Sequence, residues 1–166
     1  MKRLLILFLL FAAGAPLIAQ TDSTCSKILK LYNTLNSNDK NVRNSYKINP
    51  ASTRSGPLGS VSVYASSYSI PGFQQPEFTE GGGSTRMFTT FAPAKSYEEA
   101  TKMWEDFDKQ MHNCLTSDWT YTVNDEPKEL YKTVKVIQDG SMLNPTIRYY
   151  IARNGSTFKL VLEIVY

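Results

Sequence analysis

Histidine and cysteine are almost absent from this sequence, which contains one histidine, His112, and two cysteines among 166 residues. Zinc sites are built from clusters of these residue types with Asp and Glu, and no such cluster here has ligand spacing. The sequence also lacks a Gly-x-Ser-x-Gly nucleophile elbow, and the glycine-rich residues 81–85 lack the lysine of a phosphate-binding loop. We therefore expect no metal and no cofactor, and we favour a non-catalytic protein over an enzyme.

Long hydrophobic runs are also scarce, and the one that stands out covers residues 4–13. Two basic residues precede it and small residues follow it toward Ala19, which is the three-part pattern of a secretory signal peptide. The run is too short to cross a bilayer, since a spanning helix needs about 20 apolar residues. We expect a signal peptide at 1–19 and an exported chain, periplasmic or secreted, with a single domain at 20–166 and no membrane span.

An excess of positive charge is lacking once the signal peptide is removed. Without Lys2 and Arg3 the formal net charge falls from +3 to +1. Nucleic-acid-binding domains usually carry a strong basic excess, so the sequence argues against a nucleic-acid partner. A protein or an envelope glycan is the kind of partner that an exported, nearly neutral chain is expected to meet.

The two cysteines, Cys25 and Cys114, form an even pair in a chain that is predicted to enter an oxidising compartment. Such a pair is typical of a disulfide. A catalytic thiol is the alternative. His112 and Cys114 point to nearly opposite sides of a helix because they lie two positions apart, so only Cys25 remains as a thiol that His112 could approach.

Two amphipathic helices are predicted, at residues 97–115 and 24–35. Ser96 and Glu99 form a capping box at the start of the longer helix. Its apolar residues recur at spacings of three and four: Tyr97, Ala100, Trp104, Phe107, Met111 and Cys114. Because Cys25 lies in the first turn of one helix and Cys114 in the last turn of the other, a bridge predicts that the helices are adjacent and antiparallel on the same face of a sheet.

Alternating apolar residues predict six strands, at 61–66, 86–92, 119–123, 132–138, 146–153 and 156–166. We therefore predict an α+β fold, with two helices packed on one face of a mainly antiparallel sheet of about six strands, in the order α-β-β-α-β-β-β-β. Residues 36–60 are rich in Asn, Ser, Gly and Pro and predict a long flexible loop.

The last two strands flank Asn154 and Gly155, a pair that strongly favours a two-residue hairpin turn. A turn at these two residues pairs Tyr149 with Leu160, which places apolar residues together on one face. The opposite face has a mixed character and forms a candidate open sheet face for a partner, with Arg148, Tyr150 and Lys159.

Residues 71–84 combine two phenylalanines, two acids and three consecutive glycines. The glycines would allow close approach by a partner, so the segment is a candidate binding loop with Phe73, Phe78, Glu77, Glu80, Gly81, Gly82 and Gly83. The alternative is that both phenylalanine rings pack back onto the sheet.

From these features we expect an exported non-catalytic binding or accessory protein of a bacterial envelope. Two other functions compete with it. One is a secreted enzyme acting on glycan through loop carboxylates, such as Glu77, Glu80, Asp118, Asp125 and Glu126. The other is a structural subunit of an envelope assembly.

Overall fold

A computed structural model of the chain describes residues 23–56, 59–81, 84–117, 119–125, 132–138 and 145–166. The predicted signal peptide lies outside these residues. The helices are α1 (Thr24–Leu35), α2 (Lys40–Asn44) and α3 (Tyr97–Cys114). The strands are β1 (Lys47–Gly56), β2 (Gly59–Ser66), β3 (Glu77–Gly81), β4 (Ser84–Thr90), β5 (Trp119–Asp125), β6 (Lys132–Gln138), β7 (Thr146–Asn154) and β8 (Thr157–Val165).

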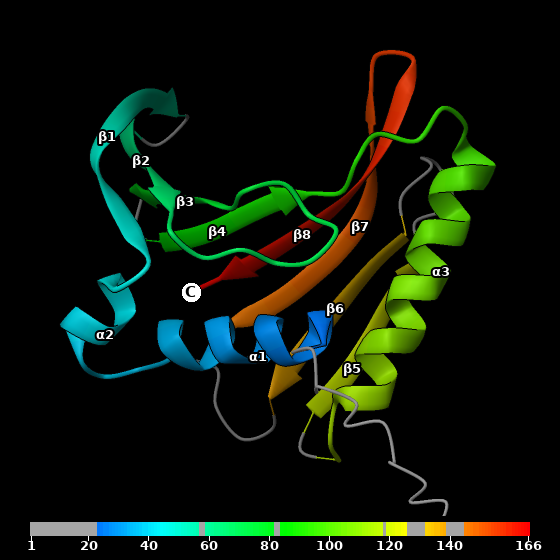
Figure 1. Cartoon of the computed structure of the whole chain (residues 1–166), viewed down its shortest axis with the longest axis horizontal. Coiled ribbons are helices and arrows are strands. Elements are labelled where there is room, and N and C mark those ends of the chain that lie inside the picture. Colours follow the sequence, from blue (N-terminus) through cyan, green and yellow to red (C-terminus); the bar gives the residue numbers. More distant parts are fainter. Residues whose placement is uncertain (1–22, 57–58, 82–83, 118, 126–131, 139–144) are drawn as a thin grey trace, which may run out of the picture.

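All of these strands belong to one antiparallel sheet in the order β1-β2-β3-β4-β8-β7-β6-β5. The sheet consists of two four-stranded meanders, β1–β4 and β5–β8, which meet where β4 pairs with β8 (Figure 1). Helices precede each meander, α1 and the short α2 before the first and α3 before the second. The predicted α+β class with a mainly antiparallel sheet is confirmed, and the sheet has eight strands where about six were expected.

The prediction of a loop at 36–60 is wrong for most of its length, because α2 and β1 lie there. β1 is an edge strand, and its pairing with β2 is interrupted by a register shift between Ile48 and Ser52. Pro50 lies within that interruption. Proline cannot donate to the ladder and is tolerated at edges and bulges, and a bulge breaks the two-residue alternation by which a strand is recognised.

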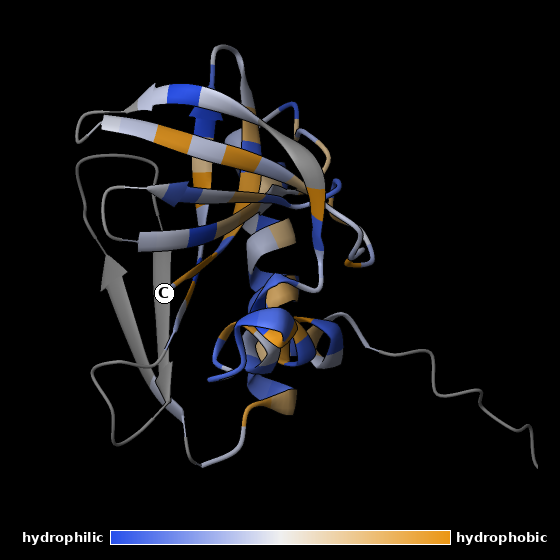
Figure 2. Ribbon diagram, turned by 90° about the vertical axis from the view of Figure 1, so that its left-hand side faces the viewer, coloured by the Kyte–Doolittle hydropathy of each residue, from blue (hydrophilic) through white to orange (hydrophobic). Residues whose placement is uncertain are grey.

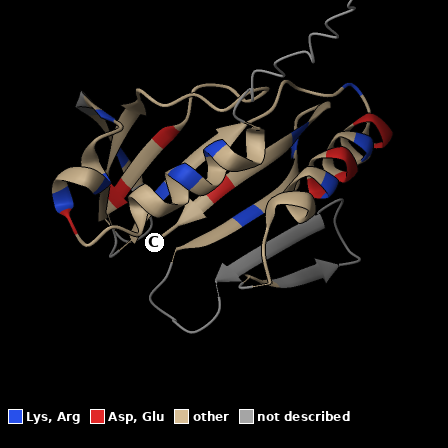
Figure 3. Cartoon of the chain, turned by 60° about the horizontal axis from the view of Figure 1, so that its bottom comes forward, with Lys and Arg blue, Asp and Glu red and all other residues tan. Residues whose placement is uncertain are grey.

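The helices α1 and α3 lie on the same side of the sheet, as the view in Figure 2 shows. Their apolar faces and the alternate residues of the central strands form the core. Its largest fully buried side chains are Tyr32, Tyr149, Phe78, Ile28, Leu31, Met87, Met111, Ile147, Ile151, Leu160, Leu162 and Ile164. The opposite side of α3 carries acidic and basic residues next to one another (Figure 3), as expected for an amphipathic surface helix.

The N-terminus of α3 is capped as the sequence predicts, with one change. The Ser96 side chain accepts a hydrogen bond from the backbone N–H of Glu99 at 3.1 Å. The Glu99 carboxylate accepts from the backbone N–H of Lys95 at 2.8 Å, one residue before the position that the standard capping box uses. At α1, Ser23 accepts from the N–H of Ser26 at 3.1 Å.

Cys25 and Cys114 are joined in a disulfide with their Cα atoms 6.4 Å apart. The bond connects the first turn of α1 with the last turn of α3. The expected antiparallel arrangement is wrong: the two helices cross steeply in Figure 1, and α1 is seen end-on in Figure 2, where α3 runs vertically. A disulfide constrains only the ends that it joins, so it is compatible with either arrangement.

The hairpin between β7 and β8 is present, but its register differs from the predicted one by two residues. Tyr149 pairs with Leu162, and Asn154 pairs with Thr157. The loop therefore consists of Gly155 and Ser156, with Gly155 at a φ of 61°, as in a type II′ turn with glycine first. A shift of two residues leaves every side chain on its predicted face.

No described helix has both the length and the hydropathy that crossing a lipid bilayer requires.

Candidate functional site

The face of the sheet opposite α1 and α3 contains a cavity of about 310 Å³. We call this face the uncovered face. The cavity lies where the segment before β3 meets the ends of β4, β7 and β8. Residues that line it include Gln74, Gln75, Glu77, Phe88, Lys159 and Val161. Its volume lies at the lower end of the range for small-molecule sites, about 300–1,000 Å³.

The sheet register explains why these side chains share one face. Glu77 pairs with Phe88 on the neighbouring strand, and directly opposed residues of an antiparallel pair point the same way. In the same manner Thr90 pairs with Val161. The residues that alternate with them, such as Met87 and Leu162, are fully buried under the helices.

The wall that Gln74 and Gln75 form is fixed by hydrogen bonds of residues 74–76. The N–H of Gln74 donates to the carbonyl of Thr90 at 2.8 Å, and the Thr90 hydroxyl donates to Gln74 Oε1 at 3.0 Å. The amide of Gln75 donates to the carbonyl of Ser66. The N–H of Ser66 in turn donates to the carbonyl of Pro76 at 3.0 Å. The cavity therefore has a preformed polar wall, which lowers the entropic cost of binding a ligand.

The two charged residues that line the cavity, Glu77 and Lys159, differ in whether they have an ion-pair partner. The Glu77 carboxylate forms an ion pair with Arg54, with 3.4 Å between Oε2 and Nη1, and both side chains are substantially exposed. Lys159 is half-buried, and its side-chain ammonium forms no hydrogen bond or ion pair with any other described residue. The cavity therefore has one neutralised acid and one available cation, above an apolar floor that includes Phe88 and Val161.

A buried carboxylate lies beside the cavity. Glu163 pairs with Phe88 in the sheet and is 4% exposed. Its Oε1 accepts a hydrogen bond from the Tyr150 hydroxyl at 2.8 Å and lies 3.7 Å from Arg86 Nη1. Buried charges require such partners. Glu163 was not among the predicted site residues, although a lone acid within the apolar run of β8 is a signal of a buried polar site.

The predicted binding loop contributes to this site in part. Phe78 is fully buried in the core, and the ring of Phe73 lies edge-on to Phe91 and Phe107, with centroids 4.6 and 5.4 Å away. The expectation that these two rings are offered to a partner is therefore wrong, and the alternative that they pack back onto the sheet is correct. Burial in the core is favourable for an apolar ring because it removes the apolar surface of the ring from water.

The polar residues of that loop divide between the two faces of the sheet. Glu77 lines the cavity, whereas Glu80 pairs with Lys47 on the other face. A Cβ at Gly81 would lie 2.8 Å from the carbonyl oxygen of Ser60, so this glycine accommodates the neighbouring strand. Gly82 and Gly83 lie outside the described residues.

Of the predicted open sheet face, Lys159 lines the cavity. Arg148 lies beside Glu163 in the sheet, directly opposite it on β7. The Tyr150 hydroxyl is engaged by Glu163. The structure thus places Glu77 of the predicted loop and Lys159 of the predicted sheet face in one cavity. The sequence predicted that they belong to two separate surfaces.

No protein-family model, curated protein or solved structure matches this chain. The site must therefore be interpreted from its own geometry.

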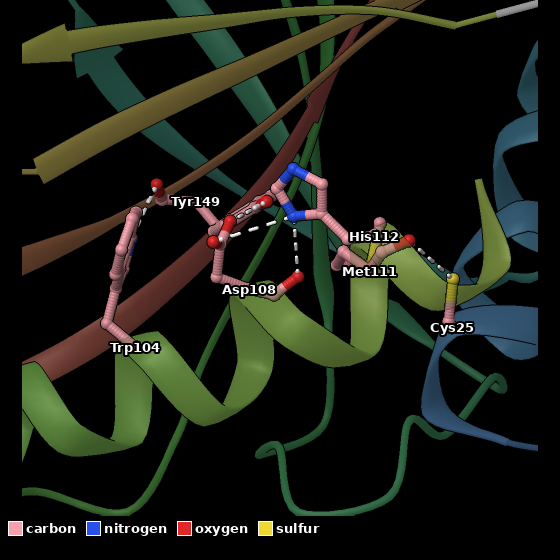
Figure 4. A network of polar contacts seen from close by, with 6 residues as sticks. All are labelled: Cys25, Trp104, Asp108, Met111, His112 and Tyr149. Carbon is pink, nitrogen blue, oxygen red and sulfur yellow. Dashed lines mark hydrogen bonds and ion pairs between the residues drawn. The ribbon is translucent and has the colours of Figure 1, made fainter. Parts of the chain in front are cut away.

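A second group of polar side chains lies on the helix-covered face (Figure 4). The Tyr149 hydroxyl donates to Asp108 Oδ1 at 2.7 Å, and His112 Nδ1 lies 3.5 Å from Asp108 Oδ2. The imidazole points toward Asp108 and away from Cys25, and Cys25 is oxidised. The alternative of a catalytic thiol with His112 is therefore wrong. Tyr149 is fully buried, so its hydrogen bond to Asp108 links the sheet to α3.

Proposed function

We propose that this chain is an exported, non-catalytic binding protein of a bacterial envelope, and that its ligand occupies the cavity on the uncovered face. The observation that carries the proposal is the lining of the cavity. An apolar floor with Phe88 and Val161 lies beside the amides of Gln74 and Gln75 and the ammonium of Lys159. Mainly apolar sites with a few fixed polar groups are typical of small-ligand binding.

The enzyme alternative has less support. Hydrolysis of a glycoside usually requires two carboxylates on either side of one bond. Glu77 and Glu80 are three positions apart on β3, so they point to opposite faces of the sheet. Each already has a basic partner, Arg54 for Glu77 and Lys47 for Glu80. Asp118 and Glu126 lie outside the described residues, as does the side chain of Asp125.

The proposal is tested with the protein expressed with its own N-terminal segment, so that the host exports it. Nuclear magnetic resonance titration with neutral and acidic monosaccharides, disaccharides and short peptides would locate any binding. We expect chemical-shift changes at backbone amides near the cavity, including those of Thr90, Ala152 and Val161. Changes confined to other surfaces, or no binding by any class of probe, would contradict the proposal.

A filled cavity provides the control. Ala152 lines the cavity and is half-buried, so Ala152→Trp should block the site and abolish the shift changes. Ala92 is exposed in the connection between β4 and α3, and Ala92→Trp should leave binding intact. Circular dichroism of both variants verifies that they remain folded.

A further inference from the structure

The proposed cavity also has features that indicate the chemical class of its ligand. We infer that it binds an acidic sugar, in which a carboxylate contacts Lys159 and the ring lies over Phe88. This inference rests on the proposed function and specifies its ligand. It follows from the charge of the cavity, from the shape of its floor and from the kind of polar group on its wall.

Charge indicates a carboxylate. Glu77 is compensated by Arg54 at 3.4 Å, and Glu163 by Arg86 and by the hydroxyl of Tyr150. Lys159 has no such partner among the described residues, so the cavity keeps one uncompensated positive charge. Because Lys159 is half-buried as a residue, an anion bound beside it would be screened less by water than an anion bound to a fully exposed lysine.

The floor indicates a ring. Phe88 is half-buried and lines the cavity together with Val161, which is 2% exposed. An aromatic ring offers a flat apolar surface, and the C–H-bearing face of a sugar ring is flat and apolar as well. A linear carboxylate such as acetate would leave this part of the cavity unused.

The wall indicates hydroxyl groups. Gln74 Oε1 accepts from the Thr90 hydroxyl, which leaves the Gln74 side-chain amide N–H groups as donors. Gln75 uses an amide N–H to bind Ser66, which leaves its side-chain oxygen as an acceptor. An amide donor and an amide acceptor on one wall match a hydroxyl-rich ligand, since each sugar hydroxyl both donates and accepts.

The deciding experiment compares galacturonic acid with galactose, which differ only in the oxidation of one carbon, by titration calorimetry at neutral pH. We expect the acidic sugar to bind at least about tenfold more tightly, because a hydrogen bond between two charged groups is about twice as strong as a neutral one. The preference should weaken in high salt. Lys159→Gln should abolish the preference, whereas Lys102→Gln, on the exposed side of α3, should leave it unchanged.

A second variant tests the sign of the charge effect. Glu77→Gln leaves Arg54 without its partner and makes the rim more positive by one charge, so it should increase the preference for galacturonic acid over galactose. Equal binding of both sugars, unchanged by Lys159→Gln, would overturn the inference on the carboxylate and leave the proposed function standing. Binding of short peptides but of neither sugar would overturn the inference on the sugar. Failure of every probe, or shift changes confined to other surfaces, would overturn the proposed function too.

Discussion

The two faces of the sheet are built from the same strands and differ in what stabilises them. On the helix-covered face, side chains such as Phe78, Met87 and Leu162 are fully buried among one another. On the uncovered face, the buried residues include Val161 and Glu163, and apolar groups lie next to ion pairs. The first face is specified by packing, and the second by individual polar contacts. Such polar positions are where ligand recognition is usually found.

The largest expected effect comes from a matched pair of phenylalanines on neighbouring strands. Phe78→Ala removes a fully buried ring and should lower the free energy of unfolding by about 3–5 kcal/mol. Phe88→Ala removes a half-buried ring on the other face and should lower it by less than about half as much. Urea denaturation measures both. Equal losses would show that the uncovered face is as tightly packed as the core.

The disulfide should have the next largest effect, and it acts on the covered face alone. Replacing both Cys25 and Cys114 with Ala should lower the free energy of unfolding by about 2–4 kcal/mol. Alanine is preferred because Cys25 is 2% exposed and serine would bury a hydroxyl there. Binding at the cavity should be unchanged in the folded variant. Two free thiols in the denatured, unreduced wild-type protein would contradict the bond itself.

A matched pair of tyrosines tests whether single polar contacts matter more on the uncovered face. Tyr149 donates to Asp108 and Tyr150 to Glu163, at 2.7 and 2.8 Å. The Glu163 side chain is 6% exposed and that of Asp108 is 21% exposed, so water can replace the lost donor more easily at Asp108. We expect Tyr150→Phe to lower the free energy of unfolding by about 2 kcal/mol and Tyr149→Phe by about 1 kcal/mol. Thermal unfolding of the two variants measures which one loses more stability. A larger loss for Tyr149→Phe than for Tyr150→Phe would contradict the prediction.

The smallest expected effect is a fall in stability at alkaline pH, caused by a buried tyrosine on the covered face. Burial raises the pKa of Tyr32 above its ordinary value of 10.0. Above pH 10 the unfolded chain therefore loses this proton before the folded protein does, and the free energy of unfolding falls as pH rises toward the folded pKa. Tyr32→Phe should reduce the slope of stability against pH in this range. An unchanged slope, measured by urea denaturation at several alkaline pH values, would contradict this.

Much of the covered face could be predicted from the sequence. The stripe on 97–115 and the cap at Ser96 identify α3, and the bounds of α1 agree with the predicted 24–35. Helices and buried strands leave periodic signals because many residues share one environment. The two missed strands lack that signal, since β1 contains Pro50 and a register shift and β3 has only five residues.

The cavity could not be predicted, although two of its charged residues were selected. Glu77 and Lys159 are 82 positions apart, and they meet only because β4 pairs with β8 at the centre of the sheet. This pairing joins the two meanders, and no local pattern in either strand specifies it. Phe73 and Phe78 were predicted to be exposed because of the composition of the loop alone. Composition does not reveal that β3 lies between β2 and β4 in the sheet.

The bond between α1 and α3 also has a consequence for proteolysis. The chain from Cys25 to Cys114, a separation of 89 residues, forms with the disulfide a covalent ring that contains the whole first meander and all of α3. A single protease cut inside the ring opens it without releasing a fragment. The connection at residues 91–96, most of which is exposed, could therefore be nicked while β4 and β8 stay paired. The nicked protein would then separate into two pieces only in the presence of both reductant and denaturant.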